Sequence, residues 1–220
     1  MVKRMRFLAV LVLLGLVASL FAGCNLMGPE AKEPEGMEGT EGTEGTEGTE
    51  GTEAGIYADI VIENYGTVTL LLDEEAAPIT VGNFVNLAES GFYDGLTFWR
   101  IMSGFMIQGG DPEKNGYGGS DTTIVGEFAA NGYDNPISHT RGTVSMARSG
   151  LSYDSASSQF FIVHQDSIFL DGQYAAFGHV TEGMDVVDKI CADAKPLDDN
   201  GTIALDAQPV ISSVTIRKQG

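Results

Sequence analysis

The stretch Phe98–Asp111, which reads FWRIMSGFMIQGGD, decides how the rest of this sequence is interpreted. It covers most of two short β-type runs, Leu96–Ile101 and Met106–Gln108, which are followed by a pair of glycines. An arginine, Arg100, stands within the first run among apolar neighbours. The stretch therefore predicts two strands, one of which carries a permanently charged guanidinium.

The flanking sequence predicts more short strands and two helices. Ile56–Glu63 alternates apolar and polar residues, and Thr67–Leu72 follows after a turn, which is typical of a hairpin. A proline opens a helix at Pro78–Glu89, and a glycine follows it. The other predicted elements are strands at Thr143–Met146, Phe160–Val163, Phe177–Val180 and Val210–Ile216, and a helix at Met184–Ala192. This order favours an antiparallel barrel or sandwich with helices over its ends.

Three further segments follow the opening stretch in a fixed order: Ser145–Arg148 (SMAR), Ser158–Ile162 (SQFFI) and Phe169–Gly178 (FLDGQYAAFG). Together the four resemble the motifs of cyclophilin-type peptidyl-prolyl cis/trans isomerases, and the likeness runs from about Ile56 to Lys218. The resemblance implies a mainly β fold, a closed eight-stranded antiparallel β-barrel capped by two α-helices. It also implies an isomerase acting on proline-containing polypeptides.

The same resemblance implies the site residues. Arg100 matches the catalytic arginine. The backbone at Ala147 and Arg148 matches the contact to the residue before proline. The complete set of implied substrate-binding residues is Phe105, Met106, Gln108, Ala147, Arg148, Gln159, Phe161, Phe169, Leu170 and Tyr174.

Three of these residues depart from the family pattern. Arg148 stands where the family has Asn, which leaves the backbone contact intact and biases the choice of substrate. Phe169 stands where many eukaryotic members have Trp, which implies weak cyclosporin binding because the indole N–H donor is missing. Tyr174 stands where many members have His, and both are amphipathic rings that can line a pocket.

The implied chemistry needs no covalent bond to the protein. Rotation of an X-Pro bond breaks amide resonance, against a barrier of about 18–20 kcal/mol for peptide bonds. An enzyme needs only to bind the twisted amide better than either planar form. The prolyl nitrogen regains a lone pair in the twisted state, and a fixed, charged donor such as Arg100 suits it. The alternative is a non-catalytic, tethered chaperone or adaptor that binds proline-containing segments.

The N-terminal residues predict export and lipidation. Three basic residues lie within the first six positions, and the nearly all apolar run Phe7–Phe21 follows, as in a secretory signal. The run ends in Leu20–Cys24 (LFAGC), which resembles a bacterial lipobox apart from Phe21 in place of the usual Leu. We expect residues 1–23 to be a signal peptide and Cys24 to become a lipidated N-terminus. An uncleaved anchor and ordinary secretion are the alternatives.

Residues 24–55 predict a disordered spacer. They contain a repeated Glu-Gly-Thr tripeptide and have too few apolar residues to fold. This leaves residues 56–220 as the isomerase domain. We therefore expect an extracytoplasmic protein, anchored to a bacterial membrane through Cys24, that assists folding there.

Charge and spacing argue against other classes of function. The net charge of the chain is −19, with 31 acidic and 12 basic residues, so a nucleic-acid partner is not expected. The three histidines lack the spacing of a metal site, and no G-x-S-x-G sequence indicates a hydrolase. Gly116–Gly119 does not complete a nucleotide-binding motif, and Cys191 is expected to be a buried, inert thiol. We expect a monomer without cofactor or metal.

Overall fold

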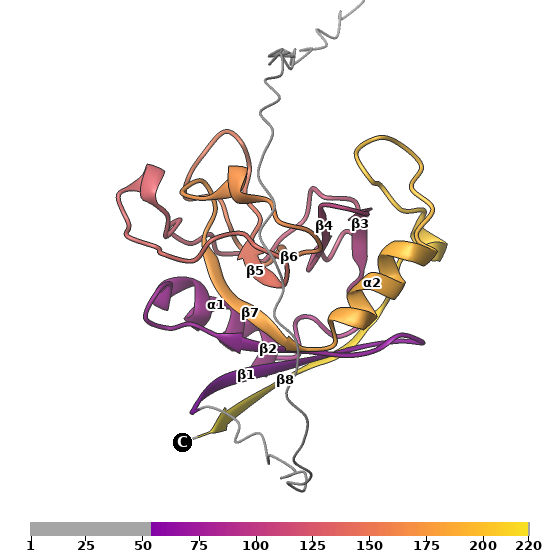
Figure 1. Cartoon of the computed structure of the whole chain (residues 1–220), viewed down its shortest axis with the longest axis horizontal. Helices are drawn as coiled ribbons and strands as arrows, with labels where there is room; N and C mark the ends of the chain where they lie inside the picture. Colours follow the sequence, from indigo (N-terminus) through magenta and orange to yellow (C-terminus); the bar gives the residue numbers. More distant parts are fainter. Residues whose placement is uncertain (1–53, 220) are drawn as a thin grey trace, which may run out of the picture. The chain divides into compact units, whose positions relative to one another are not determined.

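The computed structural model describes residues 54–219 of the chain, and the predicted signal peptide, Cys24 and almost all of the spacer lie outside them. Eight strands and two α-helices make up the described part (Figure 1). The strands are β1 (Gly55–Ile62), β2 (Gly66–Leu72), β3 (Phe98–Met102), β4 (Met106–Gly109), β5 (Thr143–Met146), β6 (Phe160–Val163), β7 (Ala176–Glu182) and β8 (Ile211–Gln219). The helices are α1 (Pro78–Glu89) and α2 (Met184–Asp193), with short 3-10 turns at Ala129–Asn131, Ile168–Leu170 and Leu205–Ala207.

The strands form one antiparallel sheet that curls into a half-barrel. Its order is β3-β4-β6-β5-β7-β2-β1-β8, so β3 and β8 are the two edges. Among the described residues these edges meet only near an isolated bridge between Thr97 and Val210. The expected closed barrel is therefore wrong, because no ladder joins β3 to β8.

A loop explains why the sheet stays open at β3. The Ile101 N–H donates to the Gly201 carbonyl at 2.8 Å, and the Ile203 N–H donates to the Trp99 carbonyl at 2.9 Å. These bonds occupy the outer edge of β3, where a closing strand would have to pair. Backbone N–H and C=O groups that are already hydrogen-bonded are not free to pair with another strand.

The core fills the hollow side of the half-barrel. Four apolar residues of α1 that recur with the helical period, Val81, Phe84, Val85 and Ala88, are all buried. Phe84 contacts the rings of Tyr93, Phe160 and Phe177, with centroids 5.1 to 5.4 Å apart. Such aromatic packing contributes stability beyond the area it buries. The helix thereby fixes β6 and β7 from the inside.

The second helix matches its prediction as well. Val186, Val187, Ile190 and Cys191 are its buried residues. Burial raises the pKa of the Cys191 thiol to about 12, so the group stays protonated at neutral pH. Within residues 54–219 neither helix is long and apolar enough to cross a membrane.

The start of α1 is held by a residue far away in the sequence. Ala77 occupies the N-cap position and makes no side-chain capping bond. Glu127 takes over this role: one carboxylate oxygen accepts the Ile79 N–H at 3.0 Å. The other oxygen accepts the Thr80 N–H and the Thr80 hydroxyl, both at 2.7 Å. The carboxylate therefore satisfies the free N–H groups of the first helical turn.

Candidate active site

The site lies on the outer face of the sheet, where β4 and β6 carry a second, smaller apolar cluster. Strand side chains alternate between faces, so Phe160 and Ile162 point into the core while Phe161 and Val163 point outward. The register pairs Gln108 with Phe161 and Met106 with Val163. The outer cluster consists of Met106, Phe161, Val163 and Leu170, with Met102, Phe105, Ala147 and Tyr174 packed against it.

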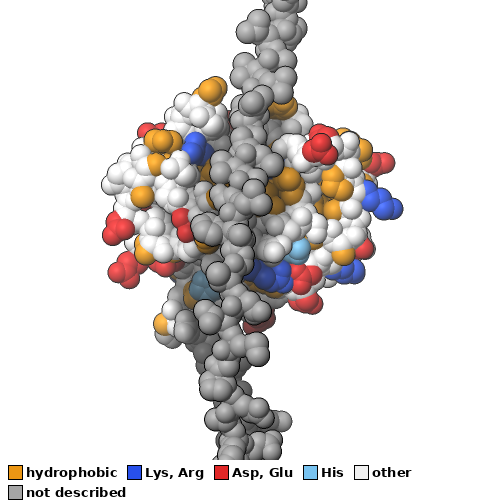
Figure 2. Space-filling model, turned by 45° about the horizontal axis from the view of Figure 1, so that its top comes forward, with side chains coloured by type: hydrophobic (Ala, Val, Ile, Leu, Met, Phe, Trp, Pro, Cys, Tyr) orange, Lys and Arg blue, Asp and Glu red, His pale blue; other side chains and the backbone are white. Residues whose placement is uncertain are grey.

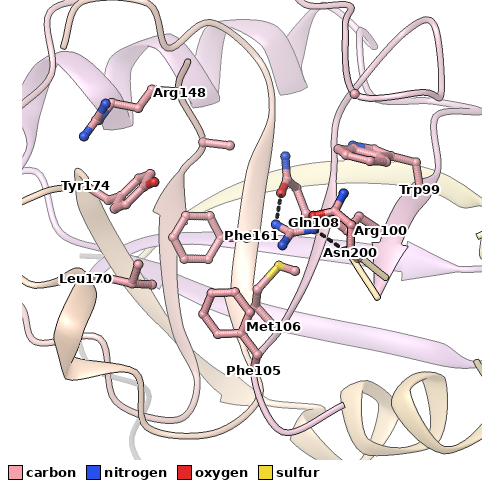
Figure 3. A pocket seen from close by; sticks show the side chains of 12 residues that line it. Trp99, Arg100, Phe105, Met106, Gln108, Arg148, Phe161, Leu170, Tyr174 and Asn200 are labelled. Atoms are coloured by element: carbon pink, nitrogen blue, oxygen red, sulfur yellow. Dashed lines mark hydrogen bonds between the residues drawn. The ribbon is translucent and has the colours of Figure 1, made fainter. Parts of the chain in front are cut away.

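Most members of this cluster line a cavity of about 250 Å³, here named the proline cavity. Figure 3 shows Phe161 between Leu170 and Tyr174 on one side and Gln108 and Arg100 on the other. Its lining residues are Trp99, Arg100, Phe105, Met106, Gln108, Gly116, Ala147, Arg148, Phe161, Leu170, Tyr174 and Asn200. The cavity thus combines apolar side chains with several polar ones, as small-ligand sites usually do.

Arg100 projects from β3 and is fixed at the edge of the proline cavity. Its Nε–H donates to the Asn200 carbonyl at 2.7 Å, and Nη1 donates to Gln108 Oε1 at 3.2 Å. The guanidinium carbon lies 5.9 Å from the centre of the Phe105 ring. Burial lowers the pKa of Arg100, opposed by nearby Tyr174 and Asp198, but a guanidinium remains charged at neutral pH. The cation is therefore preorganised beside apolar walls.

Two glutamines, here called the amide relay, set the orientation of Arg100. Gln159 Oε1 accepts a bond from Gln108 Nε2 at 2.9 Å and another from the indole N–H of Trp99 at 3.0 Å. Gln159 Nε2 donates to the Gly118 carbonyl at 2.7 Å. An indole N–H can only donate, so it requires the oxygen of Gln159 to face it. Gln108 must then turn its own oxygen toward Arg100.

The loop after β4 contributes to the lining of the proline cavity beside Trp99. The buried carboxylate of Asp111 accepts backbone N–H groups from Glu113, Asn115 and Gly116. Gly116 has φ +92°, and a Cβ there would come within 2.6 Å of the Trp99 ring. Only glycine fits this position without strain. The loop thus packs on Trp99 and continues to Gly118, which anchors the amide relay.

A second cavity of about 190 Å³ adjoins the first, and we call it the side cavity. Gln108, Gly116, Ala147 and Arg148 line both cavities. The side cavity is also lined by Gln159 and by serines of the segment that leads into β6. It is therefore more polar than the proline cavity.

The structure brings together most of the residues expected from the sequence. Of the eleven, Gln159 lines only the side cavity, and Phe169 lines neither cavity. Phe169 is 71% exposed, with its ring 5.6 Å from that of Phe105. Sequence reasoning missed Trp99, Gly116 and Asn200. Trp99 and Gly116 lay in or near the quoted motif, but nothing in the sequence connected Asn200 to Arg100, a hundred residues earlier.

His139 has the partners of a hydrolytic triad but lies in the interior. Its Nδ1 is 2.8 Å from Asp171 Oδ1, and its Nε2 is 3.0 Å from the Ser145 hydroxyl. Its ring stacks on Phe161, with centroids 6.0 Å apart. Burial lowers the pKa of His139, against the bond and charge of Asp171, which raise it. Ser145 and His139 are both fully buried, so no substrate reaches them and the group supports the wall of the proline cavity.

Metal ligation is another common role of histidine side chains. Between residues 54 and 219 there is no group of three or more His, Cys, Asp or Glu side chains that could hold a metal ion. His164 accepts the Gly104 N–H at 2.8 Å through Nδ1, while Nε2 lies 3.1 Å from Asp188. Its two nitrogens therefore connect the β3–β4 turn to α2.

Comparison with known proteins agrees with this geometry. The family model described as cyclophilin type peptidyl-prolyl cis-trans isomerase/CLD matches residues 57–218. The chain belongs to this family. Its catalytic class is accordingly that of a peptidyl-prolyl cis-trans isomerase. The cyclophilin fold also accounts for the eight antiparallel strands and two helices.

Individual relatives carry the same name. A peptidyl-prolyl cis-trans isomerase of Helicobacter pylori strain J99 is 45% identical over 129 residues, which cover 58% of this cyclophilin and 76% of the relative. Isomerase B of Bacillus subtilis strain 168 is 45% identical over 125 residues, 57% of this chain and 83% of the relative. A cyclophilin type isomerase of Cryptosporidium parvum, crystallised in the presence of the dipeptide Ala-Pro, superimposes with a TM-score of 0.65 at 27% identity. That match covers 73% of this chain and 98% of the other.

Proposed function

We propose that this cyclophilin rotates X-Pro bonds by seating the proline ring in the proline cavity and donating a hydrogen bond from Arg100 to the prolyl nitrogen. The observation that carries the proposal is the fixed guanidinium beside a cluster of apolar side chains. Asn200 and Gln108 hold the guanidinium, and Phe161 and Met106 supply the apolar surface. Substrates are stretches of polypeptide that contain proline.

The arrangement favours the twisted bond over both planar forms. A planar amide nitrogen has its lone pair in resonance and accepts hydrogen bonds poorly, whereas the twisted nitrogen has a free lone pair. A donor that is already oriented needs no reorganisation when this lone pair appears. Each 1.36 kcal/mol gained only in the twisted state accelerates rotation about tenfold. The apolar walls contribute by binding the ring equally in all states, which lowers KM.

The test is the interconversion of a short Ala-Pro peptide, followed by NMR exchange spectroscopy. A catalytic amount of the protein is expected to accelerate exchange, since the uncatalysed step takes tens to hundreds of seconds. A protein that binds the peptide but leaves its exchange rate unchanged would instead be the non-catalytic adaptor. Binding is measured separately by the fluorescence of Trp99, the single tryptophan of the chain, which lines the cavity.

We further propose that the isomerase works outside the cytoplasm, tethered by a lipid on Cys24 and separated from the membrane by the Glu-Gly-Thr spacer. The support is the sequence: a basic start, an apolar run and small residues directly before Cys24. Two or three acyl chains on one residue suffice for stable anchoring, where a single chain is marginal. Its clients would be proteins that fold after export.

Replacement of Cys24 tests the anchor. The wild-type protein, expressed in a bacterium, is expected in the membrane fraction, and Cys24→Ser is expected to lose most of this association because no thiol is left to acylate. Cys191→Ser is the matched control and should fractionate like the wild type. Equal membrane recovery of Cys24→Ser and the wild type would contradict lipid anchoring.

A further inference from the structure

The charge around the two cavities is opposite to that of the chain. The chain has 31 acidic and 12 basic residues, and acidic side chains occur on several sides of the face shown in Figure 2. The charged residues that line the proline cavity are nevertheless both arginines, Arg100 and Arg148. Arg148 is also the charged residue of the side cavity. In an otherwise acidic protein, the charged side chains that line the two cavities are thus cations, with Asp198 near Arg100.

Arg148 is held in place but lacks a counter-ion among residues 54–219. Its Nε–H donates to the Gln173 carbonyl at 2.9 Å, and Nη1 donates to the Ser149 carbonyl at 3.1 Å. The ion pairs of the described chain involve Arg141, Arg217 and two histidines, and none reaches Arg148. A guanidinium has five N–H donors, so several stay available for a ligand.

Aromatic rings fix the plane of this guanidinium. Its carbon lies 4.8 Å from the ring centre of Tyr174, 5.0 Å from Tyr153 and 5.2 Å from Phe128. Stacking on rings restrains an arginine without neutralising its charge. Because the side chain is already ordered, little conformational freedom is lost when a carboxylate binds to it.

The position of Arg148 relative to the reacting bond indicates which residue it meets. The prolyl nitrogen must lie near Arg100 and Gln108, and the residue before proline is bonded to that nitrogen. Because Gln108 also lines the side cavity, a substrate chain held near Gln108 has the side cavity directly beside it. Arg148 lines both cavities, on the opposite side of Phe161 from Arg100 (Figure 3).

We propose that Arg148 selects substrates with an acidic side chain, Glu or Asp, directly before the proline. This inference rests on the proposed function, since it takes the proline cavity as the seat of the proline ring. The carboxylate binds the free N–H groups of Arg148, beside the ring of Tyr174. A neutral residue of the same size before the proline forms no ion pair with Arg148, so it adds no such stabilisation to substrate binding.

The test compares acetylated peptides Ala-Glu-Pro-Phe and Ala-Gln-Pro-Phe, which differ in one charge but not in shape. At low ionic strength the wild type is expected to favour the glutamate peptide about fivefold in kcat/KM, as for a partly exposed ion pair. In about 0.5 M NaCl the preference should shrink toward one, since the screening length falls to about 4 Å. Arg148→Gln should abolish the preference, and Arg148→Lys should retain part of it.

Two controls separate selection by Arg148 from general attraction. Lys218→Gln removes an equal charge from the exposed end of β8, away from both cavities, and should keep the preference. A peptide with its glutamate after the proline should have the same kcat/KM as the corresponding glutamine peptide. The proposal is overturned if the wild type has equal kcat/KM for the two acetylated peptides. It is also overturned if Arg148→Gln keeps the preference of the wild type.

The outcome remains decisive if neither peptide is turned over. In that case the proposed function fails, while the ratio of the two Kd values, measured from Trp99 fluorescence, still tests selection. A ratio near one then overturns the inference as well. A ratio near five that disappears in Arg148→Gln supports it. If Arg148 served only to pack against aromatic rings, Arg148→Gln would weaken the binding of both peptides alike and leave the ratio of their Kd values unchanged.

Discussion

Replacing Arg100 by alanine is expected to lower kcat/KM for an Ala-Pro peptide by about a hundred- to a thousandfold, the usual effect of removing one preorganised donor. Most of the loss should appear in kcat, because the bond to the prolyl nitrogen exists only in the twisted state. The Kd from Trp99 fluorescence should change little, since the apolar walls Phe105, Met106 and Phe161 remain.

Two further variants separate geometry from charge. Arg100→Lys retains the charge but cannot bond both the Asn200 carbonyl and Gln108 with a planar fork, so an intermediate loss of kcat is expected. Arg217→Ala is the matched control, because Arg217 also lies over an aromatic ring and lines neither cavity. If Arg100→Ala kept wild-type kcat, the guanidinium would have no part in rotation.

The amide relay shows how far the sequence could predict this site. Arg100, Phe105, Met106 and Gln108 lie within one short motif, so any fold that preserves two paired strands brings them together. Gln159 and Phe161 follow because β6 pairs with β4. The indole of Trp99 was not predicted as a member, since its role depends on the oxygen of Gln159, sixty residues later.

The fold shows the same division between local and distant effects. Both helices could be predicted because their apolar period and end residues are local features of the sequence. The openness of the sheet could not, because it depends on Gly201 and Ile203 pairing with β3 from the far end of the chain. Residues such as these carry no local pattern that distinguishes an edge-covering loop from an ordinary one.

Glu127 is the strongest example of a residue that acts on a distant part of the chain. Its removal is expected to lower the free energy of unfolding more than any other change proposed here. Glu127→Ala should lower the free energy of unfolding by about 3–4 kcal/mol, because it leaves the Ile79 and Thr80 N–H groups and the Thr80 hydroxyl without their acceptor. Glu127→Gln keeps the volume and one acceptor oxygen, so a loss of about 1–2 kcal/mol is expected. Urea unfolding, followed by Trp99 fluorescence and by circular dichroism, measures both.

A neighbouring carboxylate supplies the comparison. Glu74 is exposed in the turn before α1, and Glu74→Ala should change the free energy of unfolding by less than about 0.5 kcal/mol.

The effect of Glu127 should also reach the site, because Asn83 of α1 donates to the Ser157 carbonyl at 2.6 Å, two residues before Gln159. Activity of Glu127→Gln should therefore fall at temperatures where the protein is still folded. Equal stability of Glu127→Ala and Glu74→Ala would mean that the first turn of α1 needs no cap, and that apolar packing of Phe84 alone holds the helix.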